Sequence, residues 1–267
     1  MPKLYLAITN HGFGHATRAA SVAATLLQCC PDLHIIVATT APQWLLQSYL
    51  PTERVSYRAV SFDIGVLQSD SLTMDKSATL EKLTWIRDHQ DEILAPEIEF
   101  LQRTGVDLIL ADIPPLVTQL AKAVDIPCWM MSNFGWDFIY RPWGSEFEVI
   151  ADWIAECFGD CDRMFRLPFH EPMVAFANIT DVGLTGGTPK LTATALRDRY
   201  GLTAPNERTV LLTFGGLGLA QIPYEKALQA YPDWQFLTFD RQAPDLPNLL
   251  KVQDRTDRKS TRLNSSH

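Results

Sequence analysis

The segment LYLAITNHGFGHATR (Leu4–Arg18) sets the expected fold of the whole chain. Its first five residues, LYLAI, are apolar without interruption, which is typical of a parallel strand buried on both faces. A loop with two glycines follows, and the small residues from Ala16 onward are compatible with a helix. Strand, glycine loop and helix in this order predict the first unit of an open parallel sheet. In such sheets ligands bind beyond the carboxyl ends of the strands.

The loop between this strand and this helix carries the first candidate site residues. Gly12 and Gly14 permit backbone angles that other residues avoid, and they let a ligand approach the main chain. The free N–H groups at the start of the helix favour an anion. His11 and His15 add side chains that can donate, accept or carry a proton near neutral pH. A turn that only packs the helix on the strand stays open as the alternative.

The same loop lacks the features of two well-known nucleotide sites. A dinucleotide fingerprint requires a third glycine where this chain has Thr17. It also requires an acidic residue after the second strand, where this chain has Thr39. A P-loop is absent because no Gly-Lys-Ser/Thr sequence follows. A nicotinamide-dependent oxidoreductase is therefore disfavoured.

Composition limits the classes of protein to consider. The 267 residues are 46% hydrophobic and 20% charged, which suits one large or two small globular domains. A net charge of −8 offers no basic surface, so nucleic acid is not an expected partner. No apolar run reaches membrane-spanning length and no signal peptide is recognisable, so we expect a cytoplasmic protein. Cys157 and Cys161 lack a second Cys/His pair, and we expect no metal site.

Strands and helices alternate along most of the chain. We expect further strands at 33–37, 55–60, 106–111, 127–131, 164–167 and 179–184, and helices at 42–50, 78–104, 116–124, 143–158 and 192–200. In the longest helix we expect Ser77 to be the cap, Pro96 to cause a kink or restart, and Gly105 to end it. This alternation predicts an α/β fold with a doubly wound, Rossmann-like parallel sheet.

Polar residues follow three of the expected strands. The carboxyl ends of parallel strands meet at one edge, so these residues are expected to lie on one rim: His11, His15, Asp112, Asn133 and Asp137. Taken singly, Asn133 and Asp137 fit equally well as caps or turn formers. The polar segment 61–75 is expected to be a connector rather than a lid.

A second unit of the same kind is expected to begin near residue 204. A linker at 203–208 precedes an apolar strand at 210–214 and a second glycine loop with Gly215 and Gly216. We therefore divide the chain into an N-terminal domain (1–203), an incomplete second domain (204–256) and a tail (257–267). The tail shares no apolar period with the preceding chain and resembles a translated sequencing adaptor. We expect it to be foreign, and the natural protein to continue.

Two Rossmann-like units, each with a glycine loop after its first strand, resemble the GT-B glycosyltransferases. The loop HGFGHATR is similar to that of the lipid-linked N-acetylglucosaminyltransferase of peptidoglycan synthesis. It is more similar to the loop in the glycosyltransferase-like N-terminal half of plant L-arabinokinase. SNFGWDFIY (Ser132–Tyr140) and LLTFGG (Leu211–Gly216) resemble segments of the same half. The resemblance covers residues 3–254.

This resemblance implies transfer of a sugar from a nucleotide-sugar donor to an acceptor hydroxyl, without a metal or other cofactor. It implies an N-terminal acceptor side and a C-terminal donor side. We expect His15 or His11 to be the base and Asp112 to orient it, because proton removal from the hydroxyl accelerates attack. The expected acceptor-binding residues are Gly12, Gly14, Arg18, Asn133 and Asp137. The expected donor-binding residues are Gly215 and Gly216.

The resemblance leaves a second interpretation open. A non-catalytic sugar-binding or regulatory module, fused to a sugar kinase, would share the same motifs. Because most of the donor-side unit is missing, we expect this chain to be inactive alone. The partners are then a nucleotide-sugar and an unidentified acceptor. Peripheral contact with a membrane is left open.

Overall fold

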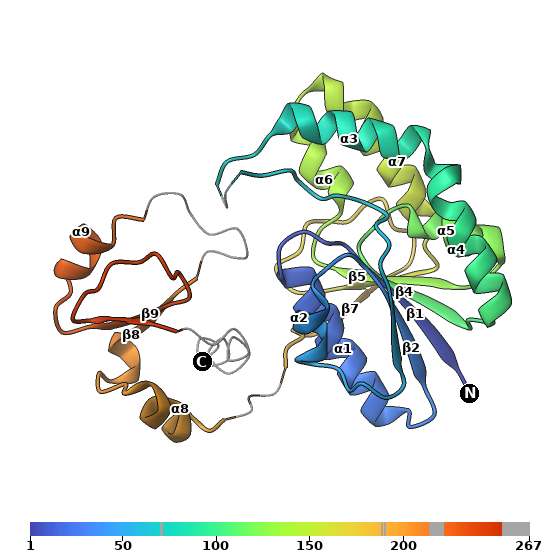
Figure 1. Ribbon diagram of the computed structural model, residues 1–267. Helices are drawn as coiled ribbons and strands as arrows, with labels where there is room; N and C mark the ends of the chain where they lie inside the picture. The colour runs from blue at the N-terminus through green and yellow to red at the C-terminus, as the bar shows by residue number, and fades with distance from the viewer. Residues whose placement is uncertain (70–71, 188, 190, 214–221, 253–267) are drawn as a thin grey trace. The chain divides into compact units, whose positions relative to one another are not determined.

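The computed structural model describes residues 1–69, 72–187, 189, 191–213 and 222–252. The chain forms two compact units (Figure 1). The first unit comprises Met1–Gln68 and Met74–Gly186, and the body of the second begins at Gly187. Each unit has its own sheet and its own core.

The first unit is built on a seven-stranded sheet with the order β3-β2-β1-β4-β5-β6-β7. All of its strand pairs are parallel, as the sequence predicts. Its strands are β1 (Lys3–Ile8), β2 (His34–Ala38), β3 (Val55–Arg58), β4 (Leu108–Asp112), β5 (Cys128–Ser132), β6 (Arg163–Arg166) and β7 (Ile179–Asp181). The chain order reverses on either side of β1, so the carboxyl end of β1 lies at the switch point where open sheets bind ligands.

Helices cover the two faces of this sheet unequally (Figure 1). One face packs against α1 (Gly14–Cys29) and α2 (Gln43–Gln47). The other packs against the helices that follow: α3 (Lys76–Asp88), α4 (Gln90–Thr104), α5 (Val117–Val124), α6 (Trp136–Tyr140) and α7 (Glu148–Gly159). Alternate residues of β1 point to opposite faces of the sheet. Leu4 and Leu6 pack in the core under α1 and α2, whereas Tyr5 and Ala7 pack in the core under α3–α7. This explains the uninterrupted apolar run.

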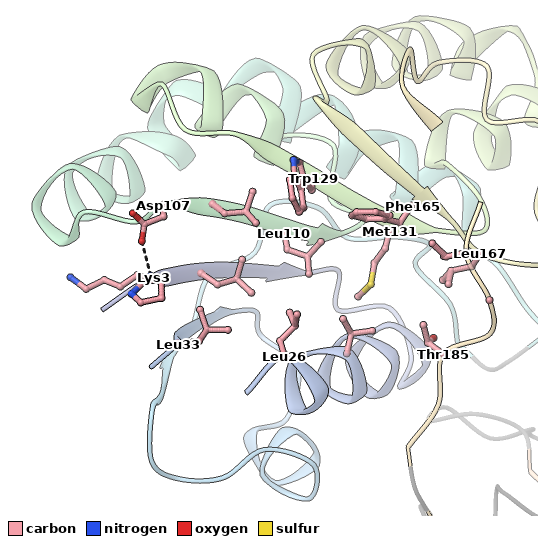
Figure 2. Close-up of a pocket in the computed structure, with 16 residues that line it drawn as sticks. Lys3, Leu26, Leu33, Asp107, Leu110, Trp129, Met131, Phe165, Leu167 and Thr185 are labelled. Carbon is pink, nitrogen blue, oxygen red and sulfur yellow. Dashed lines mark hydrogen bonds between the residues drawn. The ribbon is translucent and has the colours of Figure 1, made fainter. Parts of the chain in front are cut away.

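A groove of about 450 Å³ lies beside α1, where strands β4–β6 have no helix over this face (Figure 2). Its lining is almost entirely apolar and includes Leu26 of α1, Leu110 of β4 and Met131 of β5. Trp129 and Phe165 stand edge to face along the strand side of the groove, with ring centroids 5.7 Å apart. Most of the large apolar side chains of this groove belong to the core on the α1 side of the sheet.

The second unit repeats the layered arrangement on a smaller scale. Its three-stranded parallel sheet has the order β10-β9-β8. The elements are α8 (Ala193–Tyr200), β8 (Thr209–Leu212), α9 (Tyr224–Gln229), β9 (Gln235–Thr238) and β10 (Leu249–Lys251). Leu196 of α8 packs with Leu237 on one side, and Leu228 of α9 packs with Phe236 on the other. The second glycine loop and the tail lie outside the described residues.

Several boundaries differ from those expected. The domain boundary falls at Gly187 rather than at residue 203, because α8 packs with the second sheet. The predicted helix at 78–104 is two helices that meet at His89, and Pro96 lies inside the second. Asp75, not Ser77, caps the first by accepting from the backbone N–H of Ala78 at 2.9 Å. The helix expected at 143–158 begins at Glu148, after two short 3₁₀ turns, 141–143 and 145–147.

Candidate active site

A histidine–aspartate pair forms where β1 and β4 end next to each other. His15 lies in the first turn of α1, directly after β1, and Asp112 is the last residue of β4. The register pairs Ile8 with Asp112, so the loop after β1 starts beside this carboxyl. His15 Nδ1 lies 2.8 Å from Asp112 Oδ1. A carboxylate only accepts hydrogen bonds, so Nδ1 carries the proton and the lone pair lies on Nε2.

Arg18, one helical turn after His15, holds the other side of Asp112. Its Nε donates to Asp112 Oδ2 at 2.7 Å, and its terminal nitrogen donates to Oδ1. The second terminal nitrogen donates to Asn133 Oδ1 at 3.0 Å. The guanidinium thereby joins α1, the end of β4 and the loop after β5. A planar fork with two donors to one carboxylate fixes the position of both partners.

The charges of this cluster are balanced within it. Asp112 is fully buried, and burial alone would raise its pKa. His15 and Arg18 outweigh burial, and they hold the pKa of Asp112 below its usual range. For Arg18, burial opposes the charge, but Asp112 raises the pKa of the guanidinium above its ordinary value. Asp112 is therefore a carboxylate at neutral pH, and it is available to stabilise a protonated His15.

His11 lies in the same loop but is held by different neighbours. Its Nδ1 lies 3.3 Å from the backbone nitrogen of Val66, in the segment after β3. Its ring meets Trp136 edge to face with centroids 5.5 Å apart, and Trp136 also lies 6.0 Å from the His15 ring. Burial lowers the pKa of His11, and the nearby His15 lowers it further. The imidazole is therefore neutral at pH 7.

A second buried carboxyl, Asp63, lies close to the pair. Thr9 donates its hydroxyl to Asp63 Oδ2 at 2.6 Å, and the backbone N–H of Ile113 donates to the Thr9 hydroxyl at 3.3 Å. Burial raises the pKa of Asp63 from 3.8 to about 6, although the Thr9 hydrogen bond and His15 oppose the shift. The site thus contains one carboxyl that is ionised and one that is half protonated near pH 6.

The structure brings together most of the side chains that the sequence places on the rim. His15, Arg18, Asp112 and Asn133 form one hydrogen-bonded cluster. Asp137 does not join it: the side chain is buried under Gly135, and its Oδ1 has no hydrogen-bond partner among the described residues. Burial raises the pKa of Asp137. An acceptor-binding role for Asp137 gains no support from this position and stays a prediction.

The two loop glycines differ in what they require. Gly12 has φ +63°, a left-handed conformation that favours glycine, whereas Gly14 begins α1 with an ordinary φ. Apart from the adjacent residues and the nearby backbone of α1, no atom of the described residues lies within 4 Å of the position that a Cβ would take at either glycine. The space that an acceptor would need is thus available beside both, and their role in binding stays a prediction. Gly215 and Gly216 lie outside the described residues.

Sequence reasoning missed Asp63 and the segment that carries it. That segment follows β3 and therefore ends at the same edge of the sheet as the histidine loop, which was the available signal. It was expected to be only a connector. Instead, Asp63 is buried at the site. The backbone N–H of Val66 donates a hydrogen bond to Nδ1 of His11, and the backbone carbonyl of Gly65 accepts one from the hydroxyl of Tyr140.

The cysteines lie away from this cluster and form no disulfide. All five cysteines are free, and Cys128, Cys157 and Cys161 are buried. Within the described ranges no group of three or more His, Cys, Asp or Glu side chains is arranged to hold a metal ion. No helix among the same residues has the length and apolar character needed to cross a bilayer.

The sequence is similar to part of a much longer protein. No protein family model matches the chain. L-arabinokinase of Arabidopsis thaliana is 34% identical over 214 residues, which make up 78% of this chain and 20% of that protein. The chain therefore spans about a fifth of the length of this relative, and the match does not extend to most of it.

Solved structures share the fold at low sequence identity. The glycotransferase of kitacinnamycin matches with a TM-score of 0.63 and 15% sequence identity. The match covers 94% of this chain and 71% of the glycotransferase chain. UGT71G1 of Medicago truncatula, solved with UDP-glucose, matches with a TM-score of 0.60 and 16% sequence identity. The match covers 93% of this chain and 68% of UGT71G1. UGT89C1 of Arabidopsis thaliana, solved with quercetin, matches with a TM-score of 0.58 and 14% sequence identity. The match covers 94% of this chain and 69% of UGT89C1. The chain has the GT-B glycosyltransferase fold.

Proposed function

We propose that this chain is the acceptor-side part of a glycosyltransferase that moves a sugar from a nucleotide-sugar to an acceptor hydroxyl. The single observation that carries the proposal is the His15–Asp112 pair at the switch point of the sheet. Asp112 fixes the proton on Nδ1 of His15 and leaves Nε2 as a base. Nε2 has no hydrogen-bond partner among the described residues, and it is not among their fully buried unpartnered atoms. Its lone pair is therefore not engaged by any of these residues.

The proposed step is a base-assisted displacement. The acceptor hydroxyl attacks the anomeric carbon while His15 Nε2 takes the hydroxyl proton. A new C–O bond forms as the bond from the anomeric carbon to the phosphate oxygen breaks, and the nucleoside diphosphate leaves with the bonding electrons. Asp112 stabilises the imidazolium that forms, as in other histidine–carboxylate pairs. The nucleotide-sugar is a co-substrate, and the step assigns no role to a cofactor or metal.

Arg18 contributes to this mechanism by holding Asp112 rather than by removing the proton. A carboxylate that is buried without compensation would become protonated, and it would then stabilise a charged histidine poorly. The guanidinium fork keeps Asp112 ionised and fixes its orientation. In place of the acceptor-binding role predicted from sequence, we propose a positioning role for Arg18. Asn133 supports it through the third hydrogen bond.

The donor side of the proposal rests on the fold. UGT71G1, which shares the fold, was solved with UDP-glucose. In this chain we assign nucleotide binding to the second unit and to Gly215 and Gly216, where loop N–H groups favour phosphate oxygens. The identity of the sugar and of the acceptor is outside the proposal.

Substituting His15 tests the proposal in the full-length protein. His15→Ala is expected to lower kcat by about 10²–10⁴-fold, with a much smaller change in KM for the acceptor, because the base acts in the transition state. Nucleotide release from a panel of nucleotide-sugars supplies the assay. His170→Ala, at an exposed loop histidine, is the matched control and should keep the activity. Unchanged turnover in the His15 variant would remove this histidine from the role of base.

A second candidate function is favoured by one specific observation. The relative with 34% identity is a sugar kinase by name, and this chain matches only 20% of it. A non-catalytic sugar-binding module could therefore use the same fold. Calorimetry of the full-length protein with sugars and nucleotide-sugars separates the two: the module binds sugar without releasing nucleotide, whereas the transferase releases nucleotide when an acceptor is added.

A further inference from the structure

His11 is held tightly by the segment that follows β3. The backbone N–H of Val66 points at Nδ1 of His11, at 3.3 Å. Gly65 has φ +60°, and a Cβ on it would lie 2.6 Å from both Cβ and Cγ of His11. Real side chains do not approach so closely, and the backbone angle disfavours any other residue. Glycine at position 65 therefore allows the main chain to pack directly against the imidazole.

This packing selects one tautomer of the neutral ring. An N–H donor facing Nδ1 requires a lone pair on that nitrogen, so the proton of the neutral imidazole lies on Nε2. His11 and His15 are thus opposite in their chemistry. His15 has its proton on Nδ1 and a free lone pair on Nε2, whereas His11 offers an N–H on Nε2. The lowered pKa of His11 agrees with a ring that stays neutral.

The N–H of His11 is available to a ligand. Nε2 forms no hydrogen bond with any residue in the described ranges, and it is not among the fully buried polar atoms that lack a partner. The ring stands beside Trp136, which also adjoins the His15 ring. The donor of His11 and the base of His15 therefore both lie beside Trp136, at the end of β1.

We propose that His11 is an acceptor-binding residue that donates a hydrogen bond from Nε2 to a second oxygen of the acceptor, beside the hydroxyl that His15 deprotonates. The acceptor class is then a molecule with at least two oxygens close together, such as a polyol or a sugar, rather than a simple alcohol. This inference rests on the proposed function, and it replaces the catalytic role that the sequence predicts for His11. A neutral histidine with a fixed tautomer is an efficient donor to an uncharged oxygen.

Two substitutions at position 11 separate the two nitrogens of the ring. In His11→Asn the amide oxygen can take the place of Nδ1 and accept from Val66, but nothing replaces the Nε2 donor. In His11→Gln the longer amide can place an N–H near the former Nε2. In the full-length protein we expect His11→Asn to raise KM for the acceptor about fivefold, the effect of one lost neutral hydrogen bond. We expect His11→Gln to recover most of this loss.

The split between KM and kcat decides the role. An acceptor-binding residue raises KM more than it lowers kcat, and the glutamine variant restores KM. A fall in kcat as large as that of His15→Ala, or an equal KM increase in both variants, would overturn the proposal. His170→Asn and His170→Gln are the matched controls. Thermal unfolding of each variant excludes a folding defect as the cause of a change.

A spectroscopic measurement tests His11 even if the protein transfers no sugar. Nitrogen-15 NMR of the histidine-labelled full-length protein reports which ring nitrogen carries the proton, with His11→Asn used to assign the signal. At pH 8, where the ring is neutral, we expect Nε2 to be protonated and Nδ1 not. A neutral ring with its proton on Nδ1 would refute the inference. Failure of the transferase assay alone would refute only the proposed function.

Discussion

Asp63 is a buried carboxyl whose surroundings make stability depend on pH. Burial raises its pKa from 3.8 to about 6 in the folded state. Between these two values the folded protein binds a proton that the unfolded chain does not. The contribution of Asp63 to the unfolding free energy therefore falls as pH rises from about 4 to 6 and stays low above pH 6. Two pKa units correspond to about 3 kcal/mol.

Removing this charge should remove the part of the pH dependence that Asp63 contributes. Asp63→Asn cannot ionise, and its amide oxygen still accepts from Thr9. We expect the unfolding free energy of the variant to vary with pH less than that of the wild type by about 3 kcal/mol between pH 3 and 7. Urea unfolding at a series of pH values measures this. Asp32→Asn, at an exposed aspartate, should leave the slope unchanged. An unchanged slope in Asp63→Asn would contradict the assigned pKa.

Single residues of the site could be predicted to the extent that strand ends determine their position. His15 and Asp112 each follow an apolar strand, and parallel topology places such ends together. The direction of the Arg18 side chain could not be read in the same way, because it depends on the rotation of α1 against β4. Asp63 was missed because an irregular segment has no period from which to infer burial.

At the scale of elements, α1 carries the site histidine and packs through a face of alanines. Ala16, Ala19, Ala20 and Ala23 are almost fully buried against the sheet. Small side chains let the helix axis come close to β1, and this distance sets where His15 stands. A larger residue on this face must push the helix outward or strain the neighbouring side chains.

Ala20→Leu is therefore expected to destabilise the chain by about 1–3 kcal/mol, the usual cost of overpacking a core. Denaturant unfolding followed by circular dichroism measures the change. Gln28→Leu places the same side chain on the exposed face of α1 and serves as the control. It should change the free energy of unfolding by less than about 0.5 kcal/mol. Equal effects of the two substitutions would show that the alanine face is not tightly packed.

Helix α4 shows why local signals were insufficient. Pro96 lacks an N–H and normally disrupts a helix interior, yet α4 continues through it. Glu97 is buried next to it and accepts from the Tyr5 hydroxyl at 2.7 Å and from Arg58 Nε at 2.8 Å. These bonds tie α4 to β1 and β3. Such tertiary contacts offset the lost hydrogen bond, and a sequence pattern does not reveal them.

For the whole molecule, the apolar groove beside α1 is the surface feature with the clearest physical consequence (Figure 2). A large apolar surface open to water attracts hydrophobic probes and promotes association between chains. We expect the folded chain to bind the dye ANS in the absence of denaturant. Leu26 lines the groove and is only partly buried, so Leu26→Glu should reduce dye fluorescence severalfold.

The control for this prediction lies one residue away. Thr25→Glu introduces the same charge on the exposed side of α1 and should leave dye binding unchanged. Titration of ANS with each variant, together with thermal unfolding, distinguishes a loss of apolar surface from a loss of structure. If both variants reduce the fluorescence equally, the dye binds elsewhere.

The position of β1 between β2 and β4 also affects how the protein is made. Leu4 pairs with Ile35 on one side and with Leu108 on the other. His15 and Asp112 are 97 positions apart, so a ribosome has released His15 long before its carboxylate partner emerges. Until then the apolar strand has one bare edge, and pairing over such separations is slow. Assistance from chaperones during translation is therefore of greatest value to the strand that bears the chemistry.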